Sequence, residues 1–123
     1  KENLEINPPA EEWLEKLPGP YTLIMKKQKQ NCVAPAVTKD LDSLGVRIPD
    51  HWFMKVIETL GIPIITTSVN KTGKDFMTSL DDIDSDIKTG VDFIIDEGEK
   101  EAKPSNIVFL NKEELELRDR SKE

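Results

Sequence analysis

The stretch Pro18-Gly19-Pro20-Tyr21-Thr22-Leu23-Ile24-Met25 passes within eight positions from turn-forming residues to apolar, β-prone ones. Because proline lacks the backbone N–H that would continue a helix, the Pro-Gly-Pro turn ends any helix that precedes it. The five residues that follow are typical of a short buried strand. The stretch therefore predicts a helix, a turn and a strand near the start of the chain.

Two helices are predicted around this strand. The first covers residues 8–17, where Asn7 can accept a hydrogen bond from the free N–H groups of the first turn. The second covers residues 51–60, because apolar residues recur there at the spacing of one helix face. Asp50 is placed to cap the second helix, and Gly61 is placed to end it.

The remaining predicted elements are short. A helix capped by Ser79, with Asp82 near the capping-box position, is expected to close at Gly90. Further strands are predicted at residues 44–48, 62–67, 91–95, 106–110 and 115–118. Strands that alternate with helices predict an α/β (α+β) fold, with a twisted, mostly mixed open sheet and flanking helices.

The composition narrows the classes of function. The 123 residues are 37% hydrophobic, which favours a folded domain over a disordered chain. No apolar run is long enough to span a membrane, so no membrane partner is expected. A single cysteine, Cys32, excludes an internal disulfide and fits a reducing compartment, and a single histidine, His51, excludes a His-rich metal centre. The net charge of −7 argues against capture of nucleic acid by charge alone, and the lysine-rich residues 26–30 are predicted to form a solvated loop.

Two polar segments stand where predicted strands end, which is where open α/β sheets bind ligands. One is residues 47–51, which begin with Arg47. The other is residues 66–73, which offer hydroxyls, an amide and a glycine that could hydrogen-bond phosphate and amino-acid groups. The alternative for the second segment is a turn whose Ser and Asn side chains satisfy their own backbone.

Single polar residues leave several alternatives open. An arginine in an apolar strand needs an anionic partner, and for Arg47 this is either a ligand or a structural carboxylate. His51 is expected to fill space or to help cap a helix, and no nucleophilic role is expected for Cys32. The acidic residues 81–86 lack the glycine and the terminal glutamate of a calcium loop, so a solvated helix face is expected there.

Five segments, in order and spacing, resemble signatures of the YrdC-like threonylcarbamoyl-AMP synthase family. They are residues 17–24 (LPGPYTLI), 45–51 (GVRIPDH), 67–73 (TSVNKTG), 91–96 (VDFIID) and 103–108 (KPSNIV). Leu117-Arg118 falls where the family's "ILRxG" would follow. The family's "PT(E/D)TVYGL" and "KxRxxxxPL" segments have no match in the chain. Residues 1–123 therefore resemble the C-terminal portion of a single, incomplete YrdC-like domain.

The resemblance implies a nucleotidyltransferase that condenses L-threonine, bicarbonate and ATP to threonylcarbamoyl-AMP and releases pyrophosphate. It implies that Mg²⁺ accompanies the ATP and that no cofactor is tightly bound. The product would feed a tRNA-modifying threonylcarbamoyl transferase in the cytoplasm. Catalysis in the family is a matter of positioning and electrostatics, so neither a catalytic nucleophile nor a protein-held metal is expected.

Matching positions imply the site residues. Ser68, Asn70 and Arg118 would bind ATP. Arg47, Thr66 and Ser105 would line the side that binds threonine and the carbamate. Two departures bear on affinity, because Val69 replaces a usual alanine and the glycine-rich turn before Lys103 reads GEKEA.

Other functions remain open at this stage. One is a module of the same fold that binds double-stranded RNA, tRNA or rRNA without catalysis, although aromatic residues interleaved with Lys or Arg are lacking. Another is the YrdC-like domain of a hydrogenase maturation protein, and a third is an inactive fragment. Without the "KxR" cations, the chain by itself is expected to be inactive.

Overall fold

The computed structural model describes residues 2–29 and 31–120, and these form two compact units. The sheet unit consists of the residues up to Gly61 together with those from Pro104 onward, and the loop unit is Ile62–Lys103. The sheet unit contains four strands, β1 (Tyr21–Lys26), β2 (Ser43–Val46), β3 (Asn106–Phe109) and β4 (Glu116–Arg118), and three helices, α1 (Pro8–Leu14), α2 (Pro35–Thr38) and α3 (Phe53–Leu60). The loop unit contains α4 (Ser85–Gly90).

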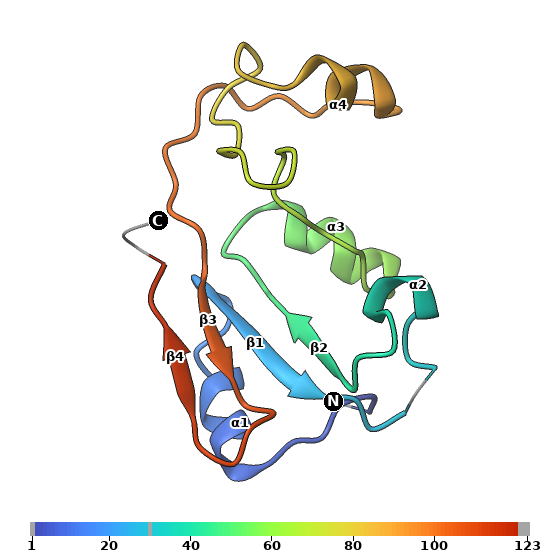
Figure 1. The fold of residues 1–123 in the computed structure, drawn as a ribbon, viewed down its shortest axis with the longest axis vertical. Coiled ribbons are helices and arrows are strands. Elements are labelled where there is room, and N and C mark those ends of the chain that lie inside the picture. The colour runs from blue at the N-terminus through green and yellow to red at the C-terminus, as the bar shows by residue number, and fades with distance from the viewer. Residues whose placement is uncertain (1, 30, 121–123) are drawn as a thin grey trace. The chain divides into compact units, whose positions relative to one another are not determined.

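The sheet is mixed and has the strand order β2-β1-β3-β4 (Figure 1). Strand β1 pairs antiparallel with β2 and parallel with β3, and β3 pairs antiparallel with β4. The α/β class with a mixed open sheet and helices is therefore confirmed. No helix within residues 2–29 and 31–120 is both long enough and apolar enough to cross a membrane.

The hydrophobic core lies between α1 and the centre of the sheet. Its buried members come from α1, β1 and the β3 segment: Ala10, Leu23, Met25, Val108 and Leu110. Helix α1 begins as predicted, because the Asn7 Oδ1 atom accepts a hydrogen bond of 2.9 Å from the Ala10 N–H. The helix ends at Leu14, earlier than predicted, and an edge-on contact between Trp13 and Tyr21 joins it to β1.

Helix α3 and strands β3 and β4 form close to the positions predicted for them. The helix begins at Phe53 rather than His51, and the Phe53 N–H donates to the His51 ring at 3.2 Å, so His51 rather than Asp50 helps to cap it. It ends at Gly61, whose φ of 70° lies in the left-handed region that glycine adopts without strain. Strands β3 and β4 lie where residues 106–110 and 115–118 predicted them.

The prediction of a fully solvated lysine loop at residues 26–30 was wrong for Lys27, while Gln30 lies outside the described residues. Strand β1 extends through Lys26, and Lys27 is buried. The Lys27 Nζ atom donates to the Thr38 hydroxyl at 3.3 Å, and Thr38 ends the short helix α2 that the sequence did not predict. A buried lysine keeps such a partner because an unbonded ammonium in the interior is costly.

The strands predicted at residues 62–67 and 91–95 do not form. Both runs lie in the loop unit, where α4 is the one regular element and no residue is buried. Ile65 is 67% exposed and Phe93 is 77% exposed. A strand needs a neighbouring strand to pair its backbone groups, and within residues 62–103 no such ladder exists.

The helix predicted from Ser79 is also shorter than expected. The Asp82 carboxylate accepts hydrogen bonds from the backbone N–H groups of Thr78 and Ser79, which closes a turn instead of a helix start. Helix α4 begins only at Ser85, with Asp84 as its N-cap. The acidic run therefore divides between a turn and a cap, and it is not one solvated helix face.

Candidate functional site

Three predicted site residues lie at the same end of the sheet. The β1–β2 register ends with the pair Leu23 and Val46, and Arg47 directly follows Val46, so it lies at the same end of the sheet as Thr22. Ser105 directly precedes Asn106, which pairs with Tyr21, and Arg118 lies opposite Ile107 near the start of β3. We call this end, where β1 and β3 begin and β2 and β4 finish, the polar end of the sheet.

Ser105 is held in place at the polar end by short contacts. Its side chain is buried, and its hydroxyl lies 2.6 Å from the Thr22 hydroxyl, so that either can donate. The backbone around it is equally fixed, because the Asn106 N–H donates to the Pro20 carbonyl at 2.9 Å and the Gly19 N–H donates to the Ile48 carbonyl at 2.9 Å. Thr22 was missed as a site residue, although it lies within the LPGPYTLI signature.

The charge of Arg47 has no partner of opposite sign among the described residues. Arg47 lies one residue beyond β2, is exposed, and makes no ion pair within the part of the chain that the structure describes. Of the two alternatives for its partner, a structural carboxylate is therefore not observed. Arg118 is also exposed, and its guanidinium lies 5.4 Å from the centre of the Phe109 ring.

The other three predicted residues lie in the polar loop, residues 66–74 of the loop unit. The Asn70 side-chain amide donates to the carbonyls of Lys71 at 3.1 Å and Lys74 at 2.9 Å, so it braces its own loop. The self-satisfying alternative therefore holds for this amide. Thr66 and Ser68 are exposed, and among the described residues their hydroxyls have no hydrogen-bond partner.

An ion-pair cluster fixes the polar loop to the start of α4. The Lys71 Nζ atom lies 2.6 Å from Asp86 and 3.2 Å from Asp84. The hydrogen bond to Asp86 contributes most to raising the pKa of Lys71, and the hydrogen bond to Asp84 raises it further. Burial alone would raise the pKa of Asp84, but the Asp86 N–H and Lys71 outweigh it and lower that pKa.

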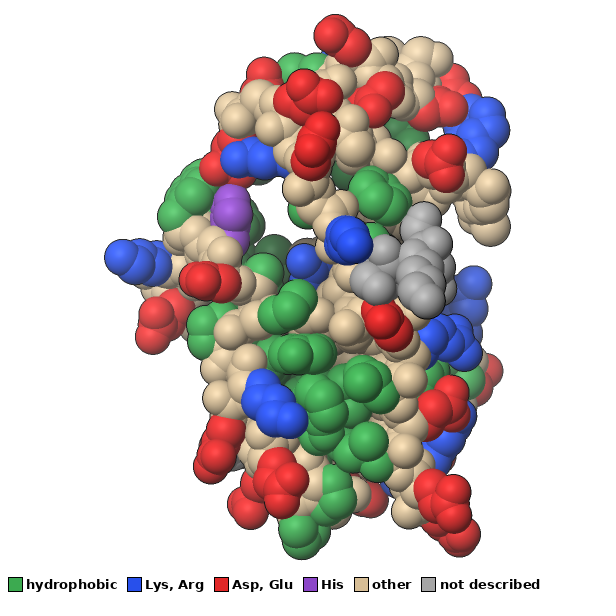
Figure 2. Space-filling model, turned by 90° about the vertical axis from the view of Figure 1, so that its left-hand side faces the viewer, with side chains coloured by type: hydrophobic (Ala, Val, Ile, Leu, Met, Phe, Trp, Pro, Cys, Tyr) green, Lys and Arg blue, Asp and Glu red, His purple; other side chains and the backbone are tan. Residues whose placement is uncertain are grey.

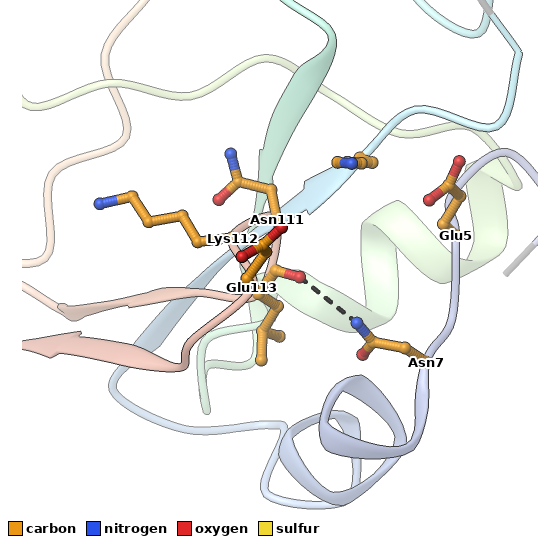
Figure 3. Close-up of a pocket in the computed structure, with 7 residues that line it drawn as sticks. Glu5, Asn7, Asn111, Lys112 and Glu113 are labelled. Carbon is orange, nitrogen blue, oxygen red and sulfur yellow. Dashed lines mark hydrogen bonds between the residues drawn. The ribbon is translucent and has the colours of Figure 1, made fainter.

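A pocket lies in the sheet unit at the carboxyl ends of the parallel strands β1 and β3, the opposite end from Ser105 and Arg118 (Figure 3). Its volume is about 240 Å³, and it is lined by Glu5, Asn7, Lys26, Leu110, Asn111, Lys112 and Glu113. The Asn7 amide donates to the Leu110 carbonyl at 3.5 Å across it. The Asn111 Oδ1 atom is buried and has no partner among the described residues.

A second hollow, of about 330 Å³, lies within the loop unit beside the polar loop. Val69, which replaces the alanine usual at this position of the resembling motif, lines it together with Met77, Ile83 and Ile87. Its walls are mainly apolar. Across the described residues, no group of three or more His, Cys, Asp or Glu side chains is arranged to hold a metal ion.

The fold defines an α/β protein with hydroxyls and cations at one end of a mixed sheet. Two solved structures of Pyrococcus abyssi Sua5 resemble it: a double variant, with a TM-score of 0.79 and 33% identity, and a complex with L-threonine, with a TM-score of 0.78 and 32% identity. They cover 93% and 94% of this chain, and 36% and 34% of the Sua5 chains. Escherichia coli YciO shares the fold, with a TM-score of 0.69, 21% identity, and coverage of 94% of this chain and 57% of YciO.

The family model described as telomere recombination (Sua5, YciO and YrdC) matches residues 2–120, and the chain belongs to this family. A Methanocaldococcus jannaschii relative is 36% identical over 89% of this chain. A Pyrococcus abyssi relative named threonylcarbamoyl-AMP synthase is 37% identical over 67% of this chain and 24% of its own length. The chain spans about half the length of the M. jannaschii relative, or 51%.

Proposed function

We propose that this chain serves in the synthesis of threonylcarbamoyl-AMP from L-threonine, bicarbonate and ATP, as a nucleotidyltransferase-type enzyme of tRNA modification. Relatives from Pyrococcus abyssi and Bacillus subtilis carry the name of this synthase, and one similar Sua5 structure is described as a complex with L-threonine. On this proposal, residues 1–123 correspond to the C-terminal portion of one YrdC-like domain. The product would pass to a threonylcarbamoyl transferase in the cytoplasm.

The observation that carries the proposal is that Arg47, which makes no ion pair among the described residues, lies at the same end of the sheet as the paired hydroxyls of Thr22 and Ser105. A guanidinium recognises a carboxylate through two parallel hydrogen bonds, and threonine offers such a carboxylate. Two neighbouring hydroxyls can donate and accept at once, which suits the hydroxyl and carbamate groups of the substrate. We assign Arg47, Ser105 and Thr66 to the threonine and carbamate side, and add Thr22 to them.

Nucleotide binding is assigned to the polar loop and to Arg118. The free Ser68 hydroxyl and the Asn70 side-chain carbonyl are the groups of the loop that we assign to ATP. Arg118 would add positive charge toward the phosphates. Mg²⁺ would enter with ATP as part of the substrate, bound by its phosphates. The side chains then act by orienting the carbamate oxygen against the α-phosphate and by stabilising charge there.

The loop unit weighs against the alternative of an RNA-binding module. It carries ten Asp and Glu residues against five lysines, and Figure 2 shows acidic side chains over much of its visible surface. Such a surface repels phosphate backbones at low salt. Titration of tRNA at several salt concentrations tests the alternative, because a steep loss of affinity with salt would favour RNA binding.

Binding rather than turnover is the appropriate test, because the 123 residues contain no "KxRxxxxPL" segment and we expect no pyrophosphate release from the chain alone. L-Threonine and MgATP are titrated separately into the ¹⁵N-labelled chain and followed by NMR. We expect threonine to shift the amide signals of Thr22, Arg47 and Ser105, and MgATP to shift those of the polar loop.

The controls are L-valine, which keeps the shape but lacks the hydroxyl, and the variant Arg47→Gln. Valine should produce little of the signal shift that threonine produces, and Arg47→Gln should abolish most of the response to threonine. Equal responses to threonine and valine, or no response to either substrate at millimolar concentration, would contradict the proposal.

A further inference from the structure

Lys71 is the one member of the polar loop whose side chain reaches a distant part of the loop unit. The other hydrogen bonds of the loop are local: Asn70 to the carbonyls of Lys71 and Lys74, and the Met77 N–H to the Val69 carbonyl at 3.0 Å. Lys71 instead reaches Asp84 and Asp86, more than twelve residues along the chain. It therefore joins the loop to the start of α4 through two ion pairs.

The anchor of this contact is itself held in place. Asp84 is the N-cap of α4, and its carboxylate accepts a hydrogen bond of 3.0 Å from the Asp86 N–H. The Asp84 side chain is only 24% exposed, whereas that of Asp86 is 78% exposed. Without Lys71, Asp84 would keep only the longer-range charge of Lys74, which forms no ion pair with it, and the two neighbouring carboxylates would repel each other more strongly, which favours the observed arrangement.

We infer that Lys71 is a positioning residue, which holds the Ser68–Asn70 part of the loop in its nucleotide-binding shape through Asp84 and Asp86 and does not itself bind phosphate. This inference rests on the proposed function of the loop. An ammonium that already serves two carboxylates carries no surplus charge for an anion. The raised pKa of Lys71 fits the same arrangement, since the carboxylates favour its charged form.

An alternative role for Lys71 predicts the opposite change in MgATP affinity for the variant Asp86→Asn. A lysine beside a nucleotide-binding loop could instead bind the phosphates directly. In that case Asp86 competes with ATP for Lys71, and the variant Asp86→Asn should tighten MgATP binding. If Lys71 positions the loop, the same variant should weaken MgATP binding, because the lysine loses its better-exposed anchor.

The experiment measures MgATP affinity and backbone amide exchange in the polar loop for four variants of the full 123-residue chain. Lys71→Met and Asp86→Asn break the contact. Lys88→Met and Asp81→Asn remove the same charges from exposed positions of the loop unit outside the contact. We expect both contact variants to weaken MgATP binding about two- to fivefold, the range for exposed ion pairs, and to speed amide exchange, while both controls leave these values unchanged.

A fifth variant, Lys71→Arg, should restore wild-type affinity because it keeps the charge and the reach. Tighter or unchanged MgATP binding by Asp86→Asn would overturn the inference, as would unchanged amide exchange in Lys71→Met. The proposed function fails separately. If the wild-type chain does not bind MgATP but amide exchange still responds to both contact variants, Lys71 positions the loop and the nucleotide assignment is wrong.

Discussion

The sheet unit and the loop unit contain similar apolar runs but differ in how far these runs are buried. Every buried hydrophobic residue of the described chain lies in the sheet unit, and residues 62–103 contain none. Residues 21–25 became a strand because β2 and β3 lie on either side, whereas residues 62–65 and 91–95 are as apolar and stay unpaired. Figure 2 shows that the sheet unit also leaves hydrophobic side chains visible on its β4 side, where Leu115 and Leu117 are about half exposed.

This difference teaches that a hydrophobic run supplies burial energy only when other elements cover it. The comparison also bears on function. The polar end of the sheet is built on hydrogen-bonded strands, while the polar loop depends on local hydrogen bonds and one ion-pair cluster. Sites on rigid elements are positioned more accurately than sites on loops. The four predictions that follow test this contrast.

The largest effect is expected from the core. Leu23→Ala should lower the free energy of unfolding by about 2–5 kcal/mol, because it leaves a cavity beside Met25 and Val108. Ile65→Ala in the loop unit is the matched control and should change that energy by less than about 0.5 kcal/mol, since its side chain is 67% exposed. Urea denaturation measures the free energy of unfolding of both variants, and an equal decrease in the two would show that Leu23 and Ile65 are buried to the same extent.

The next effect concerns nucleotide binding by the polar loop. Ser68→Ala should weaken MgATP binding by about 10- to 150-fold, the effect of losing a hydrogen bond to a charged group worth about 1.5–3 kcal/mol, and should leave the melting temperature unchanged. Asn70→Ala should weaken binding and also loosen the loop, because its amide braces the Lys71 and Lys74 carbonyls. Thr72→Ala serves as the control within the loop. If both variants lower the melting temperature and spare MgATP binding, the loop only satisfies its own backbone.

A smaller effect is expected from the two helix caps. Asn7→Ala should destabilise the sheet unit by about 1 kcal/mol, because it removes the acceptor of the Ala10 N–H beside the core. Asp84→Ala should instead speed amide exchange in residues 85–90 without a comparable loss of global stability. Urea denaturation together with hydrogen exchange separates these outcomes, and a global loss from Asp84→Ala would mean that the units unfold together.

The smallest effect is expected from acid. The hydrogen bond from the Ser79 N–H does most to lower the pKa of Asp82 below its ordinary value of 3.8, and the hydrogen bond from the Thr78 N–H adds to this effect. The stabilisation that these hydrogen bonds give the folded chain is therefore complete above pH 3.8, and it is lost as the pH falls through the lower pKa that Asp82 has in the folded state. An NMR titration should show the Thr78 and Ser79 amides moving together in that range. The same movement in Asp82→Asn would assign it to another group.

The features that the sequence predicted correctly are helix ends set by local bonds and strands whose apolar runs have a pairing partner in the sheet. Asn7 caps α1, Gly61 ends α3, and the apolar pattern of residues 106–110 coincides with β3. The wrong predictions depended on distant neighbours. Buried Lys27 needs Thr38 from an unpredicted helix, and the strands expected at 62–67 and 91–95 have no partner within the loop unit.

The candidate site divides in the same manner. The strand-end pattern singled out Arg47 and residues 66–73, the motif resemblance supplied the roles of all six site residues, and their assignment to ligands stays a prediction. The structure added Thr22 through its hydroxyl contact with Ser105 and showed that the Asn70 amide is already used within its loop. The contact between Thr22 and Ser105 could not be predicted from composition or spacing, because the two residues are 83 positions apart in the chain. The use of the Asn70 side chain within its own loop was one of the two alternatives that the sequence left open.

The sequence by itself determined the family, the start of α1 at its Asn7 cap, the end of α3 at Gly61, and the supply of hydroxyls and cations for a site. Only the tertiary structure decided the strand order β2-β1-β3-β4, the gathering of Arg47, Ser105 and Arg118 at one end of the sheet, and the contact of Lys71 with Asp84 and Asp86. The reason is physical. A helix pairs its own backbone groups within four residues, but a strand or an ion pair exists only when folding brings its partner alongside.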